Sequence, residues 1–228
     1  MWQDMQVRIE GEAVHSLQIV FLTDWYFVSG KVINEDKYFP EHRLSERHLV
    51  QITVSGPDSD WASIMQAYFA AITTAENHIY IASPYFIPNE SILTALKTAA
   101  LSGIEVCIML PNKSESHLVF YSTMSFVGEL LETGIKIYFY KKGYNHSKLM
   151  LVDGVFASIG TANLDIRSFD QNFEANAIIY DEEIATKLER LYLNDLKYCA
   201  TYTLEEWENR PWLNNAMEAL ARLMSPLF

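Results

Sequence analysis

The sequence is poor in cysteine and contains no metal-binding or redox cysteine motif. Its two cysteines, Cys107 and Cys199, lie far apart among 228 residues and outside any CxxC pattern. This spacing excludes a disulfide framework and a thiolate zinc site, and it is typical of a reducing compartment. We therefore expect both thiols to behave as small buried hydrophobic side chains.

Positive charge is also scarce. The chain holds 17 Lys and Arg against 29 Asp and Glu, for a net charge of −12. This balance argues against a broad grip on a phosphate backbone, so no nucleic-acid partner is predicted. No apolar run approaches the roughly 20 residues that span a bilayer, and no signal-peptide design opens the chain. The chain itself is predicted to be soluble, with no transmembrane segment.

Two common catalytic motifs are missing as well. The sequence has neither a glycine-rich phosphate loop nor a GxSxG motif, so P-loop and α/β-hydrolase functions have no support. What is present is an ordinary globular composition, in which 50% of the residues are hydrophobic and 20% are charged. A folded α/β domain is consistent with this balance.

Short β-rich runs alternate with longer helical patterns from about Val50 onward. Strands are expected over 51–56, 78–83, 104–110 and 135–140, with helices over 61–75, 89–102 and 117–132. This alternation favours an α/β sandwich with helices on both faces of a mostly parallel central sheet.

The pattern changes around Asp153-Gly154, the strongest type of two-residue hairpin signal. This pair separates two strand-like runs, 147–152 and 155–160. A further strand is expected over 173–180, followed by helices that include 211–224. The sequence thus predicts a late antiparallel hairpin within the sheet.

A weak internal repeat appears at an offset of 171 residues. It matches Leu17, Phe21, Leu22 and Asp24 with Leu188, Tyr192, Leu193 and Asp195. Two unrelated amphipathic helices are the alternative explanation. If the repeat is genuine, residues 1–30 are the strand and helix that end a first copy, 31–49 form a polar linker, and 50–228 form a second domain.

One constellation of polar residues dominates the chemistry of the chain. His146 and Lys148 stand two residues apart, so on an extended segment they share one face. A cation beside an imidazole favours an anion site over a salt bridge. Downstream lie Asp153, the run Gly160-Thr161-Ala162-Asn163, and Glu174.

These residues suit phosphodiester chemistry without a metal, which needs an oriented neutral nucleophile and fixed donors for the phosphoryl oxygens. His146 supplies the nucleophilic nitrogen, and Glu174 can accept a hydrogen bond from its other ring nitrogen. Lys148 and Asn163 would hold the phosphate oxygens, with Thr161 as a further donor. Asp153 is expected to have a structural role in the hairpin turn.

Two alternatives concern the histidines. A metal site built from His146, Asp153 and Glu174 is disfavoured because Lys148 would repel the cation, so neither a metal nor another cofactor is expected. His117 opens a helix and could line a pocket. The remaining histidines are expected to be solvated or to cap local structure: His15, His42, His48 and His78.

The pattern His146-x-Lys148-x4-Asp153-x6-Gly160-Thr161-x-Asn163 resembles the HKD motif of the phospholipase D superfamily. Longer stretches, including NHSKLMLVDGVFASIGTANLDIRSFDQNFEANAIIYD and ASPYFIPNE, resemble the C-terminal half of bacterial cardiolipin synthases. The resemblance implies a phospholipase D-like α/β sandwich and assigns His146, Lys148 and Asp153 to the second HKD motif. It assigns phosphate binding to Asn163 and orientation of the histidine to Glu174, while Thr161 replaces the usual serine.

The same resemblance implies an activity and a larger architecture. The activity is phosphatidyl transfer, in which two phosphatidylglycerol molecules yield cardiolipin and glycerol through a phosphohistidine. Members of this family carry two HKD motifs and this chain has one, so it resembles a fragment whose partner is the missing N-terminal half, or a second copy in a homodimer. The parent enzyme would act at the bacterial cytoplasmic membrane.

Two other functions remain open from the sequence. The first is a homodimeric phosphodiesterase or nuclease of the same superfamily, which the overall negative charge disfavours. The second is a degenerate half that only packs or binds, which the intact set of polar residues disfavours. A local basic segment fits an anionic substrate, because residues 136–148 contain Lys136, Lys141, Lys142 and Lys148 and no acid.

Overall fold

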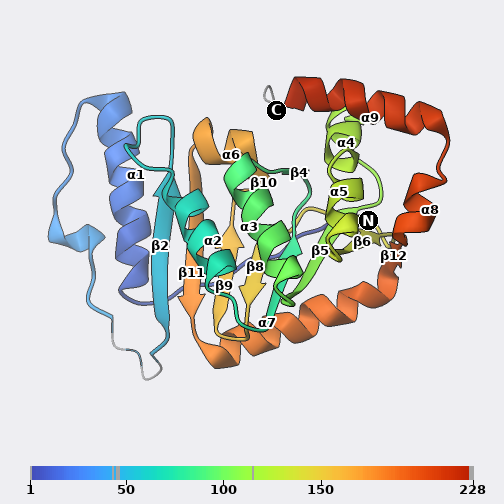
Figure 1. The fold of residues 1–228 in the computed structure, drawn as a ribbon. Coiled ribbons are helices and arrows are strands. Elements are labelled where there is room, and N and C mark those ends of the chain that lie inside the picture. Colours follow the sequence, from blue (N-terminus) through green and yellow to red (C-terminus); the bar gives the residue numbers. More distant parts are fainter. Residues whose placement is uncertain (1, 43, 45–46, 115, 226–228) are drawn as a thin grey trace.

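The computed structural model describes residues 2–42, 44, 47–114 and 116–225 (Figure 1). The strands are β1 (Trp2–Gln3), β2 (Leu49–Ser55), β3 (His78–Ala82), β4 (Phe86–Ile87), β5 (Glu105–Pro111), β6 (Lys136–Tyr140), β7 (Tyr144–Asn145), β8 (Leu149–Val152), β9 (Phe156–Gly160), β10 (Leu164–Asp165), β11 (Glu174–Tyr180) and β12 (Cys199–Thr201). The α-helices are α1 (Ala13–Ser29), α2 (Ser63–Thr73), α3 (Glu90–Leu101), α4 (His117–Met124), α5 (Val127–Glu132), α6 (Ile166–Asp170), α7 (Glu182–Asp195), α8 (Leu204–Glu208) and α9 (Trp212–Met224).

A mixed eight-stranded sheet forms the centre of the fold, in the order β12-β6-β5-β3-β8-β9-β11-β2. Strands β3, β5 and β6 are parallel to one another. The other five pairings of this sheet are antiparallel, so the expectation of a mostly parallel sheet is wrong in its proportions. The reason is that the β8–β9 hairpin reverses the chain, after which β11 and β2 pair antiparallel along the same side. The predicted α/β architecture and the hairpin are confirmed.

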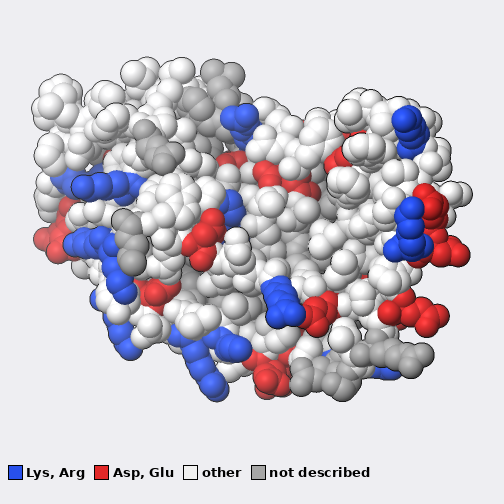
Figure 2. Space-filling model, turned by 180° about the vertical axis from the view of Figure 1, so that it is seen from behind, with Lys and Arg blue, Asp and Glu red and all other residues white. Residues whose placement is uncertain are grey.

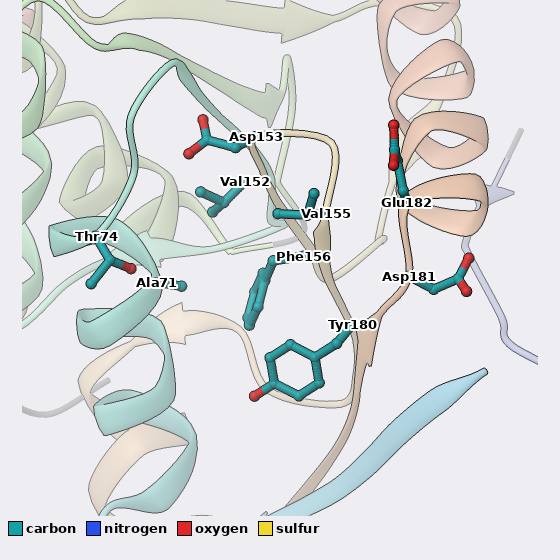
Figure 3. A pocket seen from close by; sticks show the side chains of 9 residues that line it. All are labelled: Ala71, Thr74, Val152, Asp153, Val155, Phe156, Tyr180, Asp181 and Glu182. Carbon is teal, nitrogen blue, oxygen red and sulfur yellow. The ribbon is translucent and has the colours of Figure 1, made fainter.

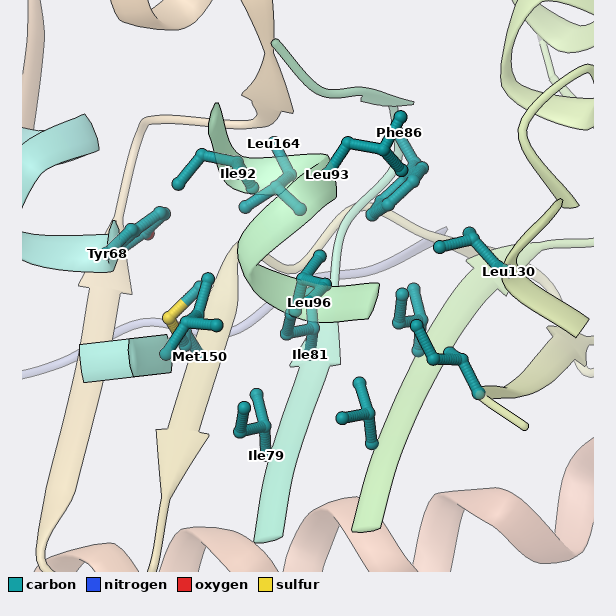
Figure 4. Packing of buried hydrophobic residues seen from close by; sticks show 14 of the residues in the cluster. Tyr68, Ile79, Ile81, Phe86, Ile92, Leu93, Leu96, Leu130, Met150 and Leu164 are labelled. Atoms are coloured by element: carbon teal, nitrogen blue, oxygen red, sulfur yellow. The ribbon is translucent and has the colours of Figure 1, made fainter. Parts of the chain in front are cut away.

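Helices cover both faces of this sheet, and each face has its own hydrophobic core. Strand β3 shows the division, because Ile79 and Ile81 join the core beneath α2 and α3 (Figure 4). Tyr80 and Ala82 point to the opposite face, where Tyr192 of α7 packs. Successive side chains of the strand therefore enter two different hydrophobic cores, so neither face of the sheet is exposed to solvent at this strand. Each fully buried isoleucine contributes about 1.5–3 kcal/mol.

The boundaries of α3 follow from its sequence. The Asn89 side chain accepts a hydrogen bond from the Ile92 backbone N–H at 3.0 Å and so caps the first turn. Gly103, with φ of 95°, follows the last turn in the left-handed region that glycine adopts without strain. Local side-chain chemistry therefore fixes both ends.

The single helix expected over 117–132 is divided into α4 and α5. Phe126 lies between them with its ring buried at 3% exposure. The Arg222 guanidinium of α9 donates a hydrogen bond to the Ser125 carbonyl at 3.0 Å. The Ser125 carbonyl oxygen can accept this hydrogen bond because the helical hydrogen-bond ladder is interrupted there. Arg222, which is distant in the sequence, therefore stabilises the break between the two helices.

The first 30 residues contain the expected helix, α1, but little of the expected strand. The strand-like run over 5–12 is irregular, and β1 is limited to two residues that pair in parallel with β7. In the segment 31–49, positions 43, 45 and 46 lie outside the described residues. The described part contains the 3₁₀ helix η1 (Asp36–Tyr38) and otherwise irregular backbone up to β2.

The two cysteines are free, as expected. Cys107 is buried and Cys199 is half-buried, and burial raises the pKa of each thiol to about 11. Such thiols are poor nucleophiles near neutral pH. Among the described helices, none has the combination of length and apolar character that a membrane span requires.

Candidate active site

His146 and Lys148 lie on the short segment that joins β7 to β8. Buried Asn145 shapes this segment, because its side-chain oxygen accepts a hydrogen bond from the Ser147 N–H at 3.0 Å. The first residue of β8, Leu149, pairs with Ala82 at the carboxyl end of β3. The two polar side chains therefore stand at the edge of the sheet where its parallel strands end, a common place for ligand sites in α/β proteins.

Lys148 and His146 share one face, as predicted. The Lys148 Nζ lies 2.9 Å from Nδ1 and 3.0 Å from Nε2 of His146, and it donates to the His146 carbonyl oxygen at 2.7 Å. Near-equal distances to both ring nitrogens place the ammonium over the ring rather than in line with one lone pair. Burial lowers the pKa of Lys148, while the carboxylates of Asp4, Glu174 and Asp165 act in the opposite direction.

The carboxylate that contacts the imidazole is Asp4. Its Oδ2 lies 3.1 Å from Nδ1 of His146. Glu174, the expected partner, uses its two oxygens elsewhere: one accepts from the Thr161 hydroxyl and the other from the Asn172 side-chain amide at 3.1 Å. Among the described residues, the expected hydrogen bond between His146 and Glu174 is not formed, and Asp4 takes that place.

The two other expected phosphate ligands, Thr161 and Asn163, lie on the loop after β9. Thr161 is exposed and joins this loop to Glu174. Asn163 is half-buried, its backbone N–H donates to the Ser168 hydroxyl at 3.1 Å, and its Oδ1 is buried without a hydrogen-bond partner among the described residues. A buried amide oxygen of this kind can be satisfied by an incoming donor or by rotation of the amide.

Gly160 permits a close approach, but the approaching group belongs to the protein. A Cβ at this position would lie 2.2 Å from Oδ1 of Asn176 and 2.4 Å from the Ala175 carbonyl oxygen. The glycine therefore lets β11 pack closely against the end of β9.

Asp153 stands at the opposite end of β8. The four residues of β8 separate it from Lys148, a distance of roughly 17 Å along an extended chain. Its carboxylate accepts hydrogen bonds from the backbone N–H groups of Glu76, Asn77 and His78 at 2.7–2.8 Å. Asp153 also lines a surface pocket of about 440 Å³ beside the hairpin (Figure 3). This geometry supports the structural role predicted for it.

Two polar residues near the site were missed by the sequence analysis. Asp165 is buried, caps α6 through a 2.6 Å hydrogen bond from the Ser168 N–H, and has its pKa raised by burial. The spacing from Asp165 to Ser168 was a usable cap signal. Asn176 is buried and bonds the Tyr68 hydroxyl at 2.8 Å. No local signal could reveal it, because its partner is 108 residues away.

The other polar candidates lie away from this cluster or do not form a site. His117 opens α4 and is exposed. Across the described chain, no group of three His, Cys, Asp or Glu side chains could hold a metal ion. On the face shown in Figure 2, basic side chains are more frequent on one side and have acidic side chains among them. The described side chains of this face form no continuous basic stripe of the kind that binds a nucleic acid.

Solved structures show the same fold class. Phosphatidylserine synthase from Haemophilus influenzae Rd KW20 superposes with a TM-score of 0.64 at 16% sequence identity, covering 78% of this chain and 48% of that one. Nuc from Salmonella typhimurium, a phospholipase D family member, gives a TM-score of 0.58 at 20% identity and covers 69% and 99% of the two chains. The fold is therefore that of the phospholipase D class.

The sequence assigns the chain more narrowly. It belongs to the family described as cardiolipin synthase, PLD-like domain, whose profile matches residues 68–196, more than half of the chain. Cardiolipin synthase of Geobacillus sp. (strain WCH70) is 47% identical over 228 residues, and cardiolipin synthase 2 of Bacillus anthracis is 42% identical. Each alignment covers 99% of this chain but 45% and 44% of the relative, so the chain spans less than half of their length.

Proposed function

We propose that this chain supplies one of the two histidine–lysine motifs of a phosphatidyltransferase that makes cardiolipin. The observation that carries the proposal is the His146–Lys148 pair, with the ammonium about 3 Å from the imidazole at the edge of the sheet. The match to cardiolipin synthases over nearly the whole chain supports the same activity. The second motif would come from the missing N-terminal half, and the enzyme would act at the bacterial cytoplasmic membrane.

The reaction has two displacements at phosphorus. One histidine attacks the phosphate of phosphatidylglycerol, the P–O bond to glycerol breaks, and the other histidine gives a proton to the departing glycerol oxygen. The hydroxyl of a second phosphatidylglycerol then loses its proton to that same base and attacks the phosphohistidine. Cardiolipin is released, and both histidines return to their starting state. His146 is one of this pair.

The surrounding residues have distinct roles in this proposal. Lys148 places a positive charge where negative charge grows on the phosphoryl oxygens, and the Asn163 side-chain amide adds a hydrogen-bond donor. Glu174 accepts a hydrogen bond from the Thr161 hydroxyl and so fixes the start of the loop that carries Asn163. Asp153 maintains the hairpin that presents the motif. No metal is needed, because the ammonium and the amide stabilise the charge that a cation would otherwise stabilise.

The test is a transfer assay with phosphatidylglycerol vesicles and the complete enzyme, comparing wild type with His146→Ala and Lys148→Ala. We expect each substitution to reduce cardiolipin formation by at least about 10³-fold, because removing a nucleophile or a charge stabiliser costs several kcal/mol of barrier. Wild-type activity should persist in EDTA. His117→Ala is the matched control and should retain activity. Hydrolysis of a nucleic-acid phosphodiester without lipid transfer would support the nuclease alternative instead.

A further inference from the structure

Helix α9 turns its large apolar side chains outward and its charged side chains inward. Trp212 is 73% exposed and Leu223 is 80% exposed. Four more large apolar side chains of this helix are exposed: Leu213, Met217, Leu220 and Met224. Asn215 is the one polar residue among the exposed positions of α9. A helix on the surface of a globular protein normally has the reverse arrangement.

The charged residues of α9 attach the helix to the rest of the protein. Glu218 is buried and pairs with Arg210 at 2.7 and 3.1 Å. One turn later, Arg222 donates to the Ser125 carbonyl oxygen at 3.0 Å and pairs with Glu129 at 2.7 Å. These contacts fix the rotation of α9 about its own axis. Its apolar side is therefore held outward by specific polar interactions.

The exposed side of α9 lies at the catalytic end of the molecule. Helix α9 packs against α4, in which the Thr123 hydroxyl oxygen accepts from the Phe86 N–H at 3.3 Å. Phe86 of β4 pairs with Leu164, the residue that follows Asn163. Figure 1 shows α9 at the same end of the molecule as α4, α6 and β10. The apolar helix thus neighbours the edge of the sheet that carries His146.

The size and composition of this surface decide what kind of partner fits it. The 13 residues of α9 span roughly 20 Å and a helix is about 10 Å wide, so the outward side covers about 200 Å². A stable protein interface needs about 800 Å² from each partner and about ten hydrogen bonds. Asn215 alone offers a polar side chain here. The boundary of a lipid bilayer accepts a short apolar helix face without such bonds, and it favours tryptophan.

We propose that α9 is an interfacial helix that docks the catalytic edge on a lipid bilayer. The choice of a bilayer rests on the proposed function, because a phospholipid substrate resides in one. The chain has a net charge of −12, so an anionic bilayer repels it as a whole. The attraction therefore comes from the apolar side chains of α9, and salt should strengthen it by screening the repulsion.

The test is co-sedimentation of the 228-residue chain with vesicles of phosphatidylcholine, alone or with an equal part of phosphatidylglycerol. We expect the wild-type chain to bind, and binding to the anionic vesicles to increase between about 0.1 and about 1 M salt. Leu220→Gln and Leu223→Gln should each weaken binding about tenfold, because each removes an apolar side chain from the contact. Leu101→Gln is the matched control and should bind normally, since this exposed leucine ends α3 just before the start of β5.

Several results would overturn the proposal. They are absence of binding by the wild-type chain, loss of binding in high salt, and equal binding by Leu223→Gln and Leu101→Gln. Loss of binding in Phe27→Gln but not in Leu223→Gln would assign the contact to the exposed apolar side of α1. A dimer in solution that dissociates in Leu223→Gln would assign this surface to a second copy.

Vesicle binding and lipid transfer are measured separately. His146→Ala should bind vesicles as the wild-type chain does, because binding needs no turnover. Binding that depends on α9, together with an inactive complete enzyme, would contradict the proposed function alone. Cardiolipin formation by the complete enzyme, together with vesicle binding that does not depend on α9, would contradict this proposal alone. Circular dichroism of each variant confirms that the substitution leaves the fold intact.

Discussion

At the scale of single residues, the motif combines chemical and structural duties at the two ends of one strand. Lys148 precedes β8 and faces the imidazole, whereas Asp153 follows it and accepts from three backbone N–H groups at the start of β3. Burial opposes the charge of Asp153, but the three donors outweigh burial and lower its pKa. A residue that shares a motif with a catalytic histidine can thus act mainly on stability.

We predict that Asp153→Asn lowers the free energy of unfolding by about 1–2 kcal/mol at pH 7, because a neutral amide accepts these hydrogen bonds more weakly. The folded-state pKa lies below the unfolded value near 3.9, so the wild-type advantage is complete above that value. It is lost as the pH falls through the folded-state pKa. Urea unfolding at several pH values measures this, with Asp170→Asn, an exposed carboxylate, as control. A constant difference down to pH 2 would contradict the prediction.

Gly160 gives a second prediction at this scale. Gly160→Ala would place a methyl group within 2.2 Å of the Asn176 side chain and 2.4 Å of a backbone oxygen. Since a backbone oxygen cannot rotate away, we expect a loss of about 2–3 kcal/mol. The matched control is Gly128→Ala on α5, where the new methyl group would lie 3.5 Å from Trp207. This control should be neutral or stabilising by up to about 1 kcal/mol. Equal melting temperatures for the two variants would contradict the argument.

At the scale of elements, the structure shows which patterns were sufficient for prediction. The hairpin was predictable because Asp153 and Gly154 both adopt positive φ, at 53° and 68°, and their residue types favour such a turn. Helix α3 was predictable from its N-cap residue Asn89 and from Gly103, the glycine that follows its last turn. The pairing of β2 with β11 was not, because it joins residues more than 100 positions apart and depends on packing that no local pattern records.

The site was predictable to a similar extent. His146 and Lys148 were identified together because they are close in the sequence and their spacing alone places them on one face. Asp4 was not identified, since its contact depends on β1, a strand of two residues paired with a distant partner. The short sequence motif was therefore enough to identify His146. The residues that surround it could be identified only from the three-dimensional structure.

The joint between α8 and α9 gives a prediction at the element scale. The Arg210 guanidinium binds both oxygens of Glu218 at 2.7 and 3.1 Å, and it lies 3.2 Å from the centre of the Trp207 ring. Glu218 is buried at 7% exposure, so Arg210→Ala would leave an unpaired buried carboxylate. We expect a loss of about 3–5 kcal/mol, or release of α9 from the body.

Hydrogen exchange by mass spectrometry distinguishes these two results. Release of α9 should speed exchange over 212–224 and leave the central sheet protected. Arg190→Ala on the exposed side of α7 is the control and should change neither exchange nor the melting temperature. Unchanged protection of α9 together with unchanged stability in Arg210→Ala would refute the assigned role of this ion pair.

At the scale of the whole molecule, one motif per chain has a catalytic consequence. The sequence contains a single His-x-Lys-x4-Asp pattern, whereas the proposed reaction uses two histidines at one phosphate. We predict that the 228-residue chain alone folds but makes no cardiolipin, because one imidazole cannot be both the covalent nucleophile and the proton donor to the leaving oxygen.

The measurement is cardiolipin formation by the purified chain, alone and mixed with a separately produced first half, alongside its mass in solution. Activity should appear only in the mixture and should be lost when the second-half chain carries His146→Ala. Cardiolipin formation by the chain alone, above a His146→Ala control, would show that a pair of identical copies can replace the two halves.

The position of Asp153 has a further consequence for how the motif tolerates changes in length. Four residues of β8 carry the chain from the catalytic edge of the sheet to the turn that holds the start of β3. Inserting or deleting one of them would reverse the face of every later side chain, so Lys148 and Asp153 could not both keep their partners. The number of residues between Lys148 and Asp153 thus matches the length of β8. The same four residues therefore set the position of Lys148 at the reacting edge and the packing of the hairpin turn at the opposite edge.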